Sequence, residues 1–196
     1  MKQIGIRLVL AAGALMLLQT HLPAQVRGDD AQMRAAREEA EIVLDLGRLL
    51  GFVYRMTTER EELRLSDAQA VRLLEVVDQI RAESRLDGEK AGRYMARIED
   101  DILTASQLIH TDRLWITSER SRSNEAAGSA TQQQRGGRNN SAATGSGASA
   151  TAEGAAGDLA TFAAGGAYNP LIDEDRHQGR DVAALHAYLR ERTGRR

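Results

Sequence analysis

The chain has 196 residues, a formal net charge of −2 at pH 7 and no cysteine. This length allows one domain with tails, and the absence of thiols excludes disulfides, thiolate metal sites, cysteine nucleophiles and a lipid-modified N-terminal cysteine. Residues 26–120 hold 15 basic and 20 acidic side chains, and no segment is basic enough to predict a nucleic-acid-binding surface.

The first 25 residues have the layout of a secretory signal peptide. Lys2 and Arg7 make the start positive, residues 8–18 are an unbroken apolar run of 11, and a polar stretch with the small residue Ala24 follows. A membrane-spanning helix needs about 20 apolar residues, so we expect cleavage near Ala24 and no stable membrane insertion afterwards. The mature chain is then expected in the periplasm or outside the cell.

Residues 30–62 are predicted to form the first helix of an all-α protein. Large apolar residues recur there every three or four positions, as on one face of a helix, and this stripe consists of Ile42, Leu46, Leu49, Val53 and Met56. Gly47 and Gly51 lie one helical turn apart, which indicates either a close helix crossing or a locally softened helix.

The second predicted helix begins at the segment Leu65-Ser66-Asp67-Ala68-Gln69. The Ser66 hydroxyl can accept a hydrogen bond from a free backbone N–H group, and Gln69 can reach back to complete a capping box. Asp67 in the first turn suits the positive end of the helix dipole. An apolar stripe follows at Ala70, Leu73, Leu74, Val77 and Ile80.

Two further helices are predicted before residue 122. The third follows the break at Asp87-Gly88, with an apolar stripe at Ala91, Tyr94, Met95, Ile98 and Ile102. The fourth begins at Leu103-Thr104-Ala105-Ser106-Gln107, which repeats the order of leucine, hydroxyl cap, two spacers and glutamine. Its buried face is expected at Leu108, Trp115 and either Leu114 or Ile116, and we expect it to fade near Arg122.

The remaining sequence changes character. Residues 121–166 are mostly Ser, Gly, Ala, Asn and Gln, which cannot bury enough surface to offset the entropy of ordering, so we predict a disordered linker. Residues 167–196 are predicted to be a short segment with an amphipathic helix, whose stripe is Val182, Leu185, Tyr188 and Leu189. Such a helix is marginal alone, and it would dock on the domain, on a partner or nowhere.

The sequence contains no recognisable catalytic motif. The histidines after the signal peptide are His110, His177 and His186, and none is spaced from another as zinc ligands on one helix would be. The run Glu99-Asp100-Asp101 is interpreted as a solvated turn, because adjacent helical residues point in different directions. Hydrolase, phosphate-binding and metalloprotease motifs do not occur. We therefore expect a non-enzymatic protein with no cofactor, no catalytic residues and no metal site.

The predicted elements make a small helical bundle or a helical-hairpin cradle of about four helices over residues 26–120. The paired starts, formed by Leu65, Ser66 and Gln69 and by Leu103, Thr104 and Gln107, resemble the L-T-x-x-Q motif that occurs twice in the Spy/CpxP family of periplasmic proteins. The resemblance covers roughly residues 63–120. It implies a curved α-hairpin cradle, often a homodimer, in an ATP-independent chaperone or envelope-stress regulator.

Two hypotheses for function follow. In the first, the protein binds partly unfolded clients or other envelope proteins through an apolar face that is partly open to solvent, with candidate residues Met56, Val77, Ile80, Tyr94, Met95 and Ile98. In the second, it is a structural or scaffold protein of the envelope. Its helices then close around Leu49, Leu73, Leu108 and Trp115, and its final helix, 181–192, is a tethered interaction motif for an unknown partner.

Overall fold

A computed structural model describes residues 23–135 and 157–194, and these residues are helical apart from connections, of which 164–176 is the longest. The elements are α1 (Pro23–Glu59), η1 (Glu61–Leu63), α2 (Asp67–Ala82), α3 (Gly88–Ala96), the π-helical η2 (Arg97–Ile102), α4 (Ala105–Arg135), a short helix at 157–163, and α6 (His177–Thr193). The all-α prediction is confirmed. Residues 1–22, which hold most of the expected signal peptide, lie outside the described residues.

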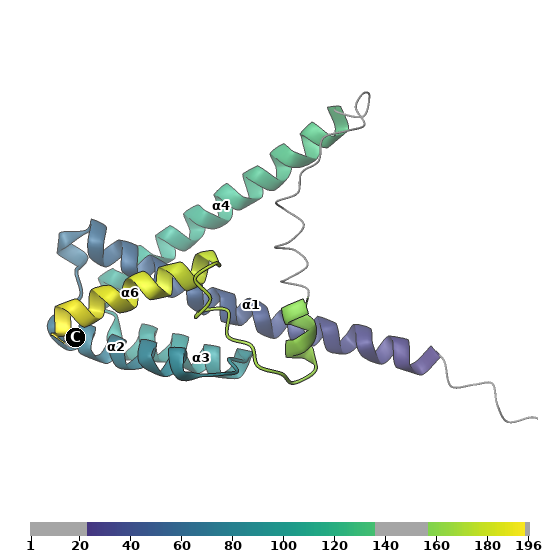
Figure 1. Ribbon diagram of the computed structural model, residues 1–196. Coiled ribbons are helices and arrows are strands. Elements are labelled where there is room, and N and C mark those ends of the chain that lie inside the picture. The colour runs from purple at the N-terminus through teal and green to yellow at the C-terminus, as the bar shows by residue number, and fades with distance from the viewer. Residues whose placement is uncertain (1–22, 136–156, 195–196) are drawn as a thin grey trace, which may run out of the picture.

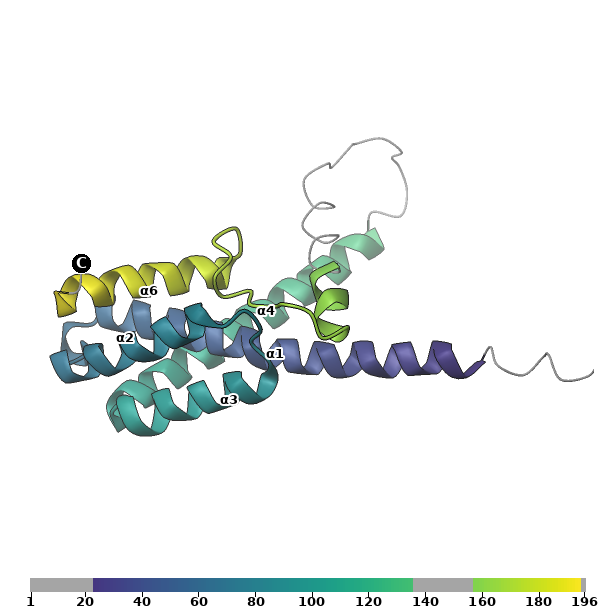
Figure 2. The same ribbon diagram turned by 60° about the horizontal axis from the view of Figure 1, so that its bottom comes forward.

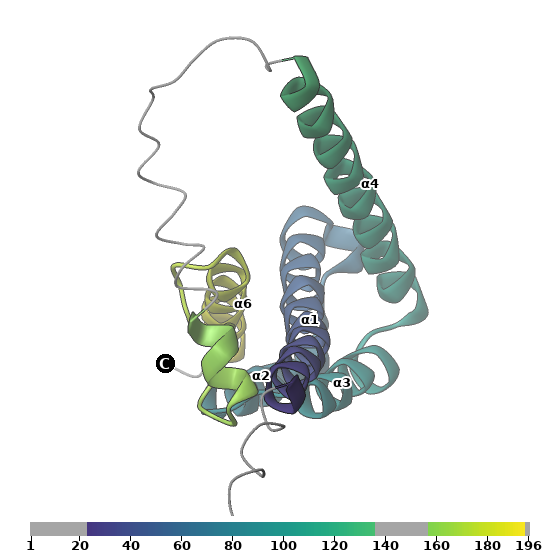
Figure 3. The same ribbon diagram turned by 90° about the vertical axis from the view of Figure 1, so that its right-hand side faces the viewer.

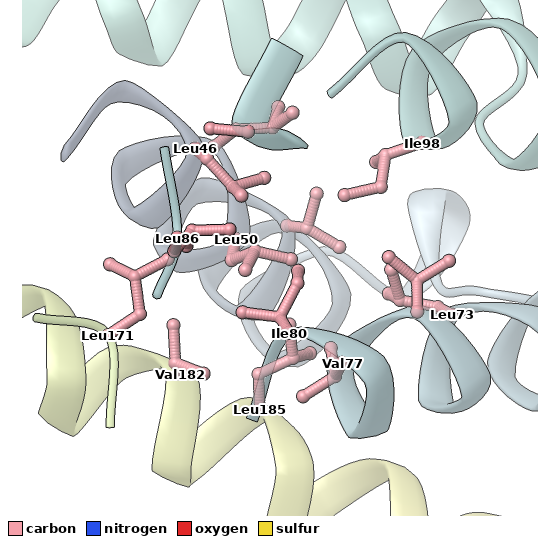
Figure 4. Close-up of a cluster of buried hydrophobic side chains, with 14 of the residues drawn as sticks. Leu46, Leu50, Leu73, Val77, Ile80, Leu86, Ile98, Leu171, Val182 and Leu185 are labelled. Atoms are coloured by element: carbon pink, nitrogen blue, oxygen red, sulfur yellow. The ribbon is translucent and has the colours of Figure 1, made fainter. Parts of the chain in front are cut away.

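The helix α1 runs through the middle of the molecule (Figures 1 and 2). The helices α3 and α6 pack against it, α2 packs against α6, and α4 contacts α1 before it projects away from the other helices (Figure 3). The core lies where these helices meet (Figure 4), and its labelled members are Leu46, Leu50, Leu73, Val77, Ile80, Leu86, Ile98, Leu171, Val182 and Leu185.

The predicted helix starts are confirmed in atomic detail. The Ser66 hydroxyl accepts a hydrogen bond from the backbone N–H of Gln69 at 3.3 Å, and the side chain of Gln69 accepts one from the backbone N–H of Ser66 at 2.8 Å, which completes the capping box. Asp87 begins α3 in a similar way, because its carboxylate accepts a hydrogen bond from the backbone N–H of Lys90 at 2.8 Å.

The glycine pair on α1 marks a close helix crossing, one of the two interpretations of the sequence. A Cβ atom at Gly47 would lie 2.6 Å from Cδ2 of Leu171 and 2.9 Å from Cβ of Gln178, and one at Gly51 would lie 2.7 Å from Oδ2 of Asp181. Real Cβ atoms essentially never approach other atoms this closely. The two glycines therefore let the C-terminal segment lie directly on the backbone of α1.

The C-terminal segment belongs to the core, so its helix docks on the domain, one of the three placements that the sequence left open. Val182, Leu185 and Leu189 of α6 are fully buried, and Phe162 of the preceding helix is 1% exposed. The Nδ2 group of Asn169 donates hydrogen bonds to the backbone carbonyls of Ile80 at 2.8 Å and Glu83 at 2.9 Å. Asn169 thereby adds hydrogen bonds to two carbonyl groups at the end of α2, where the helix cannot supply its full set of N–H donors.

The predicted disorder of residues 121–166 is wrong where the chain is described. The helix α4 continues to Arg135, and residues 157–163 form a helix. The stretch after Arg122 contains no proline and several alanines, so it keeps a helical propensity although it has few apolar residues to bury. The rest of the predicted linker, residues 136–156, lies outside the described residues.

Candidate functional site

The two repeated helix starts lie side by side and are joined through their glutamines. The Nε2 group of Gln69 donates hydrogen bonds to Oε1 of Gln107 and to the backbone carbonyl of Ile102, both at 2.7 Å. The Nε2 group of Gln107 donates in turn to the backbone carbonyl of Leu63 at 3.0 Å. Each glutamine thus reaches the backbone just before the other repeat.

Gln107 also caps its own helix. Its Oε1 atom accepts a hydrogen bond from the backbone N–H of Thr104 at 2.9 Å, and the Thr104 hydroxyl accepts one from the backbone N–H of Gln107 at 3.4 Å. Both glutamines are buried, as are the leucines Leu65 and Leu103 that open the two repeats. The sequence predicts the capping roles of Ser66, Gln69, Thr104 and Gln107, but it does not disclose that the two glutamines pair with each other.

The expected client-binding face is corrected by the structure. Met56, Val77, Ile80 and Ile98 have no exposed surface, and all four belong to the core. They are buried because α3 and α6 cover the stripes of α1 and α2 that the sequence left without a partner. The last two residues of the expected face, Tyr94 and Met95, are half-buried and pack against the same core.

A polar and aromatic cluster attaches α4 to α1. Arg48 of α1 donates a hydrogen bond to Oε1 of Glu119 at 2.9 Å, and its guanidinium lies 4.7 Å from the ring centroid of Trp115. The rings of Phe52 and Trp115 meet edge to face, with centroids 6.1 Å apart. Arg48 also pairs with Asp45, whose pKa is raised by burial against the opposing effect of this arginine.

The apolar residues of α4 are less buried than predicted. Leu108, Leu114 and Trp115 are half-buried, and the exposed fractions of Ile109 and Ile116 are 52% and 49%. The expected buried face is wrong, and the buried polar residues of α4 are instead Gln107 and Thr111. Ile109 and Ile116 are seven residues apart and therefore lie on the same side of the helix.

Two shallow hollows accompany these exposed isoleucines. One has a volume of about 400 Å³ and lies between η1 and α4, lined by Arg60, Glu62, Leu63, Ser106, Ile109, His110 and Arg113. The other has a volume of about 460 Å³ and follows α4, lined by Trp115, Ile116, Glu119, Arg120, Ser123 and Asn124. The surface of α4 around Ile109 and Ile116 therefore has both exposed apolar side chains and shallow hollows.

The other titratable groups that the sequence drew attention to lie apart from one another. His186 pairs with Asp78 of α2 at 2.8 Å, and His177 pairs with Asp181 at 3.1 Å. The pKa of Glu99 is raised, first by burial and then by the negative charges of Asp112 and Asp100, of which Asp112 has the larger effect. Within the described parts of the chain, no group of three or more histidine or acidic side chains could hold a metal ion.

No family model, curated protein or solved structure matches the chain. Among residues 23–135 and 157–194, no helix has the length and apolar content needed to cross a membrane.

Proposed function

We propose that this chain is an exported, non-catalytic protein that binds partly unfolded or other envelope proteins in a chaperone-like role, through the exposed side of α4. The observation that carries the proposal is the pair Ile109 and Ile116, about half exposed beside two hollows, on a helix that projects from an otherwise closed core. Exposed apolar side chains grouped on one surface are typical of protein-binding sites. The repeated starts at Ser66 and Thr104 add the resemblance to periplasmic chaperones.

The expected strength of binding suits transient capture. Full burial of an isoleucine side chain contributes about 1.5–3 kcal/mol, and each of these two is already about half buried. A client segment that covers both would gain on the order of 2 kcal/mol from them, which is roughly a thirtyfold contribution to affinity. Several such contacts along α4 would hold an unfolded segment without trapping it.

The test is suppression of aggregation without ATP. Residues 26–196 are added to a chemically unfolded, aggregation-prone protein, and light scattering is compared with that of the double variant Ile109→Ser and Ile116→Ser. The matched control replaces Ile42 and Ile172, which are 37% and 46% exposed elsewhere on the surface. We expect the α4 variant to lose most of the suppression and the control to keep it; equal activity of all three proteins would refute the proposal.

The alternative, a structural or scaffold envelope protein, is favoured by the closed core. Leu49 and Leu73 are buried as that hypothesis requires, although Leu108 and Trp115 are only half-buried. Its interaction motif needs revision, because the apolar side chains of α6 face the protein's own core and are not free for a partner. In this alternative the wild-type chain does not suppress aggregation, and crosslinking in the envelope identifies one stable partner.

A further inference from the structure

The lining of the hollow between η1 and α4 combines basic and apolar side chains. Arg60, just before η1, and Arg113 of α4 line it together with the apolar side chains of Leu63 and Ile109. Ser106 and His110 also line the hollow. Glu62 is the acidic member of this lining, so the arginines outnumber the carboxylates by two to one.

The two arginines are available to a ligand. The contact of Arg60 with Glu62 is 4.0 Å long between side chains that are 57% and 68% exposed, and an exposed pair of this kind contributes little to stability. Arg113 is exposed, and within the described parts of the chain its guanidinium has no hydrogen-bond or ion-pair partner. Neither arginine would have to give up a strong internal contact to bind a carboxylate.

The walls of the hollow are held in place by the paired helix starts. Gln107 of α4 donates its hydrogen bond to the backbone carbonyl of Leu63, and Leu63 lines the hollow. Gln107 is itself fixed by Gln69 at 2.7 Å. The relative position of η1 and α4 is therefore set before a ligand arrives, and a preorganised site loses less conformational entropy on binding.

We propose that this hollow binds an acidic peptide segment of a partner protein that carries one large apolar side chain. The carboxylates would pair with Arg60 and Arg113, and the apolar side chain would cover Leu63 and Ile109. Arginine and carboxylate groups match in geometry and form charge-assisted hydrogen bonds. The inference rests on the proposed function and names the chemical class of the partner. A nucleic acid is disfavoured, because contacts to its backbone need a strongly basic surface and residues 26–120 carry a net charge of −5 from 15 basic and 20 acidic side chains.

The test measures fluorescence anisotropy of labelled peptides with residues 26–196 of the chain. The probe has the sequence Asp-Glu-Leu-Glu-Asp, with one control in which lysines replace the acidic residues and another in which glycine replaces leucine. We expect the acidic probe to bind about tenfold more tightly than either control. Its affinity should fall several-fold between about 50 and about 300 mM salt, because these charges are exposed and screened.

The matched variants remove two positive charges each. The double variant Arg60→Gln and Arg113→Gln should weaken binding of the probe about tenfold. The double variant Arg34→Gln and Arg37→Gln changes exposed arginines of α1 that lie about 35 Å or more along the helix axis from Arg60, and it should change binding less than twofold. Equal effects of the two double variants, or equal binding of the lysine peptide, would overturn the inference.

Two further outcomes separate this inference from the proposed function. If the chain binds vesicles of anionic phospholipid but not the acidic probe, Arg60 and Arg113 serve a membrane surface and the inference is wrong. If the probe does not bind while aggregation suppression still depends on Ile109 and Ile116, the inference fails and the proposed function stands. Binding of the probe without any suppression of aggregation would support the peptide site and refute the chaperone-like role.

Discussion

Replacement of Gln69 by alanine removes three side-chain hydrogen bonds from the junction of the two helix starts. The bonds connect it to the backbone N–H of Ser66, the carbonyl of Ile102 and the side chain of Gln107. At about 1 kcal/mol for each bond, the expected loss in the free energy of unfolding is about 3 kcal/mol. The loss should not be smaller, because Gln69 is 7% exposed and water cannot readily replace these contacts.

The same reasoning predicts the outcome of a double-mutant cycle. Gln107→Ala also removes three bonds, to Thr104, Leu63 and Gln69, and the last of these is shared with the first variant. The double variant should therefore lose about 1 kcal/mol less than the sum of the two single variants. Additivity would mean that each glutamine only caps its own helix.

Urea unfolding followed by circular dichroism measures these free energies, with the slope of the transition checked for constancy. Gln79→Ala is the matched control, because this glutamine is exposed and makes one hydrogen bond, with Arg97 at 3.2 Å. It should change stability by less than about 0.5 kcal/mol. A loss below about 1 kcal/mol for Gln69→Ala, or single effects that add within about 0.3 kcal/mol, would refute the paired arrangement.

Three other substitutions test the fold at separate points. Gly47→Ala should lower the free energy of unfolding by about 1–3 kcal/mol through overpacking, whereas Gly92→Ala, where a Cβ atom meets nothing within 4 Å, should raise it by about 0.5–1 kcal/mol in the same urea assay. Glu99→Gln should raise the melting temperature at neutral pH, because burial and Asp112 raise the pKa of this carboxyl in the folded state and so make its ionised form destabilising. This gain should disappear as the pH falls through the raised pKa towards the ordinary value of 4.5, and a gain independent of pH would contradict the assignment.

The helix starts could be predicted because capping chemistry is local. Ser66 and Gln69, and likewise Thr104 and Gln107, need only three residues of separation to satisfy one another's backbone groups, and Asp87 follows the same logic. The hydrogen bond from Gln69 to Gln107 joins residues 38 positions apart. Its formation depends on how α2 and α4 are placed, which no local rule supplies.

Burial was harder to predict than helicity. An amphipathic stripe shows that one face of a helix is apolar, but it does not show which element packs against that face. The stripes through Met56, Val77 and Ile80 belong to the core because α6 returns to α1 and α2 over a long sequence separation. Trp115 has a large aromatic side chain of the kind expected in a core, yet it is half-buried. The sequence feature that indicated the packing of α6 on α1 was the spacing of Gly47 and Gly51. From the sequence alone, this spacing predicts either a close helix crossing or a locally softened helix.

The closed core also decides which experiments can locate a binding surface. A chain cut after Arg122 would lose α6, and with it the buried side chains Val182, Leu185 and Leu189. The apolar surfaces of α1 and α2 beneath them would then be exposed, and such surfaces bind unfolded proteins whatever the intact chain does. Suppression of aggregation by that fragment would therefore reflect the exposure of apolar surface that α6 normally covers, and not an activity of the intact chain. Substitutions at Ile109 and Ile116 leave the core intact, so only these separate binding by α4 from binding by an opened core.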